Sequence, residues 1–84
     1  MEKSLTVLDE KGFHARPATL FVTAAVKFKS TVTVEANGKS ANGKSLLNLL
    51  GLGIKHGQVI KVVTSGEDEE PALQQLCSIL QKTE

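Results

Sequence analysis

The chain has few of the side chains that often stabilise small proteins. It contains one cysteine, two prolines, three phenylalanines and neither tryptophan nor tyrosine. A single cysteine excludes an internal disulfide framework and is typical of a reducing compartment, so we expect a cytoplasmic protein. One thiol and two histidines, His14 and His56, are too few ligands for a metal cluster, and we expect no metal.

Long apolar runs and an excess of one charge are missing as well. No apolar run approaches the about 20 residues of a membrane-spanning helix, and residues 1–10 lack the apolar stretch of a signal peptide, so membrane insertion is not expected. Ten basic and nine acidic residues leave a net charge of +1, which gives no indication of nucleic-acid binding. The remaining composition, 40% hydrophobic over 84 residues, predicts one small globular domain over residues 1–84.

Hydrophobic periodicity predicts seven elements, and Asn37-Gly38 is a strong signal for the type I′ turn of a hairpin. The order β-α-β-β-α-β-α with short connections predicts an α+β fold, an open-faced two-layer sandwich with a four-stranded antiparallel sheet and three helices on one face. The expected elements are a strand over 4–8, a helix over 15–28, strands over 31–35 and 39–41, a helix over 46–50, a strand over 58–65, and a last helix that buries Ala72, Leu73, Leu76, Cys77 and Leu80.

One nucleotide-binding pattern is present and is rejected. Gly38, Gly43, Lys44 and Ser45 satisfy the spacing of a P-loop, between a predicted strand and a predicted helix. The preceding strand alternates threonine and valine, whereas a central parallel strand is apolar on both faces. A hairpin turn at Asn37-Gly38 would also break the loop, so nucleotide hydrolysis is not expected.

The segment from Gly12 to Ala18 carries the densest functional signal. His14 immediately precedes the first predicted helix, whose first N–H groups lack partners and whose dipole favours an anion. Arg16 is the single arginine, and its guanidinium matches phosphate oxygens. The pattern indicates a phosphorylatable imidazole at His14, with Arg16 and the backbone at Pro17 and Ala18 as the phosphate-binding groups.

The pKa of a free histidine, about 6.5, allows this chemistry. The helix dipole and Arg16 disfavour the imidazolium, so we expect a neutral ring whose nitrogen lone pair attacks phosphorus. The residues alone leave a second interpretation open, a surface histidine in a glycine-rich turn beside an arginine in an ion pair. His56, between Lys55 and Gly57, fits such a turn, and we assign it no role.

These residues resemble the HPr family, the histidine-containing phosphocarriers of the bacterial sugar phosphotransferase system. The resemblance covers essentially the whole chain and rests on Gly12–Ala18, on Asn42–Ser45 with Leu46-Leu47, and on Gly66–Glu69. It implies that His14 accepts a phosphoryl group from phosphorylated enzyme I, which phosphoenolpyruvate charges, and donates it to IIA domains of sugar permeases. It also implies that Arg16 neutralises the phosphate, and that the protein is a carrier without a cofactor, not an independent enzyme.

The chain departs from the family pattern around Ser45. Alanine is commoner where Gly43 stands, and Asn48 and Gly51 differ too. In many Gram-positive relatives a kinase phosphorylates the serine matching Ser45, so the alternative function is a regulatory module that binds regulatory proteins. Ser45 also fits a helix N-cap, and we favour the cap alone. The sequence of this segment is also similar to that of HPr-like domains in fused fructose-specific transferases. This leaves open a second interpretation, in which the chain is a domain excised from such a fusion.

Five leucines crowd residues 46–52, and the short helix in this segment can bury one stripe of side chains. We expect Leu49 and Leu52 to face the sheet. The expected docking patch for enzyme I and IIA domains consists of outward-facing leucines together with two residues of the first helix, namely Leu46, Leu47, Leu50, Thr19 and Leu20.

Overall fold

The computed structural model describes residues 1–8, 10–13 and 15–81. The elements follow the predicted order and are β1 (Glu2–Thr6), α1 (Ala15–Ala25), β2 (Thr31–Ala36), β3 (Lys39–Asn42), α2 (Leu46–Leu50), β4 (Val59–Ser65) and α3 (Glu69–Leu80). Each predicted element is therefore present.

Two elements have boundaries that differ from the prediction by more than one residue. β1 begins and ends two residues earlier than expected, because its pairing with β4 places Leu5 opposite Ile60 and ends at Thr6. α1 ends at Ala25 and does not reach Phe28. The N–H of Val26 still bonds to the i−4 carbonyl. The next two N–H groups bond to the i−3 carbonyl, as in Lys27 N–H to Ala24 O, and this tightening ends an α-helix.

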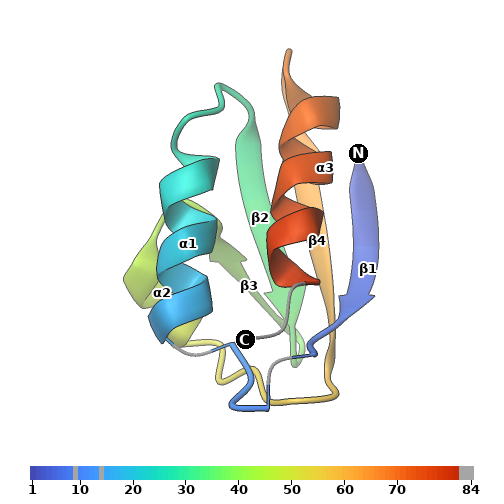
Figure 1. The fold of residues 1–84 in the computed structure, drawn as a ribbon. Helices are drawn as coiled ribbons and strands as arrows, with labels where there is room; N and C mark the ends of the chain where they lie inside the picture. The colour runs from blue at the N-terminus through green and yellow to red at the C-terminus, as the bar shows by residue number, and fades with distance from the viewer. Residues whose placement is uncertain (9, 14, 82–84) are drawn as a thin grey trace.

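The four strands form one antiparallel sheet in the order β1-β4-β2-β3, and the three helices cover one of its faces (Figure 1). Side chains alternate between the two faces of each strand, and in β2 and β4 every second residue is buried. Val34 and Val62 are fully buried at the centre, and α1 and α3 pack side by side above them. This is the predicted open-faced α+β sandwich, and the predicted stripe of α3 is buried throughout.

The β2–β3 hairpin has the predicted turn. Asn37 and Gly38 both have positive φ, 55° and 73°, as a type I′ turn requires, and Ala36 pairs with Lys39. Most residues between Gly38 and Ser45 therefore belong to strand β3 and do not form a phosphate-binding loop, as the rejection of the P-loop pattern predicted.

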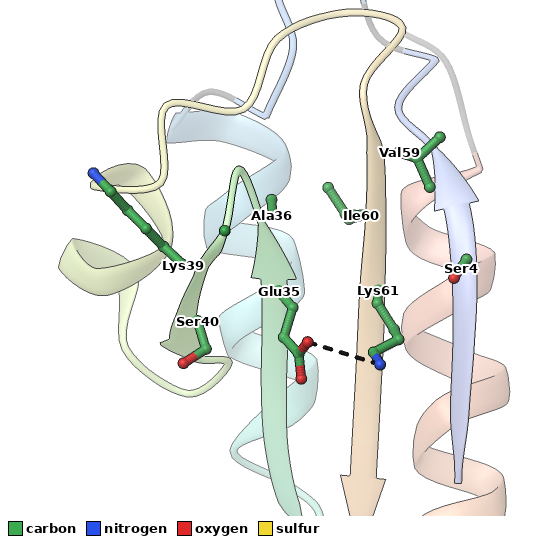
Figure 2. Close-up of a pocket in the computed structure, with 9 residues that line it drawn as sticks. Ser4, Glu35, Ala36, Lys39, Ser40, Val59, Ile60 and Lys61 are labelled. Atoms are coloured by element: carbon green, nitrogen blue, oxygen red, sulfur yellow. Dashed lines mark ion pairs between the residues drawn. The ribbon is translucent and has the colours of Figure 1, made fainter.

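The uncovered face of the sheet is mainly polar, although Val59 is exposed there. A row of side chains crosses it from Ser4 through Lys61 and Glu35 to Ser40, following the register of the strands. Figure 2 shows Lys61 and Glu35 pointing toward one another across a hollow on this face, with Nζ and Oε1 3.7 Å apart. Lys61 also lies 3.6 Å from a carboxylate oxygen of Glu2, so two glutamates share this one lysine on the sheet.

Polar contacts hold together the end of the sandwich at which β2 and α3 begin. The Asp68 carboxylate accepts hydrogen bonds from the backbone N–H groups of Lys29 and Ser30, both at 2.8 Å, and from the Ser30 hydroxyl. The buried Thr64 hydroxyl donates to the carbonyl of Glu69 at 2.9 Å. These bonds tie the α1–β2 loop and β4 to the start of α3.

Position 43 requires glycine for a steric reason that the sequence did not reveal. Its N–H donates to Val32 O at 2.7 Å, which extends the β2–β3 pairing, and a Cβ at this position would lie 2.3 Å from Val32 Cγ1. The alanine that is commoner in the family pattern does not fit here unless Val32 moves.

We predict that Gly43→Ala lowers the free energy of unfolding by about 1–3 kcal/mol, the usual cost of overpacking a core. Gly51→Ala is the matched control, because a Cβ there meets no atom closer than 3.4 Å and φ is −66°. Urea unfolding of both variants checks the prediction, and equal stability of the two would contradict it.

A second prediction concerns the stability of the fold at low pH. The hydrogen bonds to Asp68, that of the Ser30 hydroxyl first, lower its pKa from 3.8 to about 2. A carboxyl group whose pKa is lower in the folded state stabilises the fold above the unfolded-state pKa, and this contribution disappears as the pH falls toward the folded-state pKa. Asp68→Asn should therefore be less stable than the unchanged protein at pH 7, with a difference that shrinks between about pH 4 and pH 2.

Urea midpoints of the two proteins across this pH range give the measurement. The Gly66 N–H also lowers the pKa of Glu69, but this contribution is common to both proteins and cancels in the difference. Glu67→Gln serves as a control at an exposed carboxylate that lies 3.2 Å from Lys29 Nζ. A difference between the unchanged protein and Asp68→Asn that stays constant from pH 6 to pH 2 would rule out the assigned role.

Candidate functional site

The loop that leads into α1 is held by close backbone contacts. Gly12 has a φ of 74°, and a Cβ on it would lie 2.5 Å from Ile54 O and 2.7 Å from the Cα of Lys55. Phe13 is buried, its N–H donates to Ile54 O at 3.1 Å, and its ring meets Phe21 edge-on with 5.8 Å between centroids. The two residues before position 14 are thus fixed to the α2–β4 loop and to the core.

The first turn of α1 has the electrostatics predicted from the sequence. Ala15 begins this helix of 11 residues, and its first turn contains no acidic side chain that would neutralise the positive end of the dipole. Arg16 is exposed, Pro17 is half-buried and the side chain of Ala18 is buried. Proline has no N–H, so of the two backbone positions predicted to bind phosphate, Ala18 can donate a hydrogen bond and Pro17 cannot. His14 lies outside the described residues.

Thr19 and Leu20 continue this surface. The Thr19 hydroxyl donates to the carbonyl of Ala15 at 2.7 Å, so it is bonded within the first turn, and Leu20 is 49% exposed. With Ala15 and Arg16 they line one shallow depression. A hollow with a cationic residue and an apolar side chain therefore lies directly beside the helix start.

The leucines of α2 divide between core and surface. As predicted, Leu49 and Leu52 are buried, Leu47 is 82% exposed and Leu50 is partly exposed. Leu46 differs from the expected outward orientation, because it is partly buried and packs against the core. α2 contacts α1, so its exposed leucines lie on a helix adjacent to the one that carries Arg16 (Figure 1).

Ser45 caps α2, as its position in the sequence predicted. Its Oγ accepts hydrogen bonds from the backbone N–H of Asn48 at 3.4 Å and from the Asn48 side-chain amide at 2.9 Å. The second of these bonds comes from a residue at which the chain departs from the family pattern. Two donors therefore occupy the hydroxyl oxygen in this arrangement.

The remaining reactive residues form no second cluster in the described part of the chain. His56 is exposed in the turn before β4, and burial raises the pKa of the Cys77 thiol on the inner side of α3. Within residues 1–8, 10–13 and 15–81, no three histidine, cysteine or acidic side chains come together as a metal site would require. None of the helices there has the length and apolar character needed to cross a membrane.

Sequence reasoning missed the α2–β4 loop. Gln58 and Asn37 meet there through their side-chain amides at 2.5 Å, although 21 residues separate them. Lys55 N–H donates to Gln58 Oε1 at 2.6 Å, next to the carbonyl that holds Phe13. No local pattern signals such contacts, because they arise when the hairpin and the loop fold to the same end of the sheet.

Comparison with known proteins identifies the architecture. The family model described as the PTS HPr component phosphorylation site matches residues 1–82. A phosphocarrier protein HPr from Bacillus anthracis is 37% identical with a TM-score of 0.91, and the match covers 96% of each chain. HPr-C-His from Thermoanaerobacter tengcongensis is 38% identical with a TM-score of 0.92, over 96% of this chain and 91% of that one.

The structural relatives also include a protein named for regulation. Crh, the catabolite repression HPr of Bacillus subtilis, is 36% identical over 98% of each chain, with a TM-score of 0.71 in its solution structure. Phosphocarriers and a catabolite repression protein therefore share this fold at similar sequence identity.

Proposed function

Since the chain belongs to the HPr family of the phosphotransferase system, we propose that it carries a phosphoryl group on His14 from phosphorylated enzyme I to the IIA domains of sugar permeases. The single observation that supports this most is the first turn of α1. It follows His14 directly in the sequence, contains no acidic side chain and presents Arg16 at the surface.

The transfer uses one bond made and one bond broken at phosphorus. A nitrogen of the neutral His14 ring attacks the phosphorus, and the bond to the nitrogen or oxygen of the donor breaks with its electron pair staying on the donor. Donation to the IIA domain repeats the step with His14 as the leaving group. The phosphoryl group originates from phosphoenolpyruvate, so the carrier needs no cofactor of its own.

The strength of the phosphate interactions suits a carrier. Negative charges at a helix N-terminus are stabilised by about 0.3–1 kcal/mol, and by about 2 kcal/mol when they are partly buried. Arg16 adds a charge-assisted contact, and Ala18 offers a backbone donor. These interactions favour the phosphorylated form without trapping the group, which a relay requires.

The exposed apolar side chains beside the helix start are proposed to dock the partner proteins. Leu47, Leu50 and Leu20 lie on α2 and α1, and Thr19 joins them beside Arg16. Leu46 contributes through the packing that supports α2. Apolar patches of this kind, rimmed by polar residues, are typical of transient interfaces, and a cytoplasmic relay needs such an interface for each exchange.

A second candidate function is a regulatory module controlled by phosphorylation of Ser45, which would bind regulatory proteins. The similarity to a catabolite repression HPr supports it. The two hydrogen bonds that Ser45 Oγ accepts from Asn48 count against it, because they engage the oxygen that would attack phosphorus. The carrier function therefore remains the first proposal.

Incubation with enzyme I and phosphoenolpyruvate tests the carrier. We expect one acid-labile phosphoryl group per chain, complete loss of labelling in His14→Ala, and unchanged labelling in the matched control His56→Ala. Circular dichroism checks that each variant is folded. Labelling that persists in folded His14→Ala would remove the proposal.

The same assay tests Arg16, and analysis of the phosphate that the protein carries in cells separates the two candidates. Arg16→Ala should slow labelling about tenfold or more without abolishing it, because it removes a charge-assisted contact worth about 1.5–3 kcal/mol. Acid-stable phosphate on Ser45 in cells, without any acid-labile phosphate, would favour the regulatory module instead.

A further inference from the structure

The peptide unit between Ile54 and Lys55 joins two hydrogen bonds that lead to different parts of the molecule. Its carbonyl accepts the N–H of Phe13 at 3.1 Å, and its N–H donates to Gln58 Oε1 at 2.6 Å. Because a peptide unit is planar, the bond that orients its N–H also orients its carbonyl. Hydrogen bonds that share a peptide group in this way also polarise one another.

Gln58 is itself held in place. Its Nε2 donates to Asn37 Oδ1 at 2.5 Å, and its backbone carbonyl accepts the N–H of Val7 at 2.9 Å. Asn37 is fixed by the type I′ turn, and its Nδ2 donates to the carbonyl of Leu52 at 3.1 Å. Both ends of the Gln58 side-chain amide are thus bonded, one to the hairpin and the other to the Ile54–Lys55 peptide.

The same peptide unit supports the loop before α1 by packing. Gly12 lies so close that a Cβ would meet both Ile54 O and the Cα of Lys55. Phe13 is 4% exposed, so its position is also fixed by the core. Gly12 and Phe13 rest on the one peptide that Gln58 orients, and they lead directly to position 14 in the sequence.

We propose that Gln58 is a positioning residue for phosphoryl transfer, which orients the Ile54–Lys55 peptide that holds Phe13. The inference rests on the proposed function of His14, but its structural part can be measured separately. A group-transfer reaction depends on the alignment of its nucleophile, and small displacements from outside the reacting groups reduce its rate. Gln58 acts through Phe13 and does not itself touch the phosphoryl group.

Amide hydrogen exchange tests the structural part. In Gln58→Met, which keeps the length of the side chain but removes both polar atoms, exchange at the Phe13 N–H should accelerate about fivefold or more, the effect of losing one hydrogen bond. Exchange at Val34 and Val62 in the centre of the sheet should stay within about twofold. Gln58→Ala is made alongside, so that the result does not depend on how methionine fits.

Two further variants give the comparison. Gln58→Glu keeps an acceptor for the Lys55 N–H but loses the donor to Asn37 Oδ1, so protection at Phe13 should lie between that of the unchanged protein and that of Gln58→Met. Gln74→Met, at an exposed position of α3, makes the same chemical change away from the loop and should leave exchange at Phe13 unchanged.

Phosphoryl transfer tests the functional part. The rate of labelling by phosphorylated enzyme I should fall about fivefold or more in Gln58→Met, fall less in Gln58→Glu and be unchanged in Gln74→Met. The proposal is overturned if Phe13 exchange is unchanged in the folded Gln58 variants, if all amides accelerate equally, if glutamate behaves like methionine, or if exchange changes while transfer does not. If the unchanged chain accepts no phosphoryl group at all, the proposed function is refuted instead. The exchange result would then still test whether Gln58 orients the peptide that holds Phe13.

Discussion

Burial of alternate side chains on one face of the sheet is the constraint on which the rest of the molecule depends. β4 lies between β1 and β2, and its inward residues Ile60, Val62 and Thr64 form the floor on which the helices pack. Because the strand period is two, the register of β4 decides which face of each neighbour is buried. The opposite face remains mainly polar, with Lys61 between Glu2 and Glu35.

The two ends of the sandwich are fastened in different ways. At the end where β2 and α3 begin, Asp68 binds the backbone of the α1–β2 loop through charge-assisted hydrogen bonds. At the end where α1 begins, close backbone packing and amide hydrogen bonds connect the loops. There Gly12 packs closely on the α2–β4 loop, and the Ile54–Lys55 peptide links Phe13 to Gln58. The proposed phosphoryl site benefits from the first turn of α1, because that turn has no carboxylate to compete with an anion.

The surface around that helix start combines one arginine with apolar side chains. Arg16 and Leu20 line the same depression, and α2 presents Leu47 nearby on an adjacent helix. Ser45 begins α2 and is engaged as its cap by Asn48. The hydroxyl that a kinase could phosphorylate, that of Ser45, is thus also the group that Asn48 holds in a structural role.

Local chemistry in the sequence determined much of this protein. The period of the apolar residues determined the seven elements and the buried stripe of α3, Asn37-Gly38 determined the hairpin, and the order of residues 12–18 placed Arg16 in the first turn of a helix. Each of these depends on residues close together in the chain. The tertiary structure alone decided that Gly43 lies against Val32, that Leu46 turns toward the core, and that Gln58 bonds to Asn37. These outcomes depend on which segments meet after folding, and no local period or turn signal specifies that.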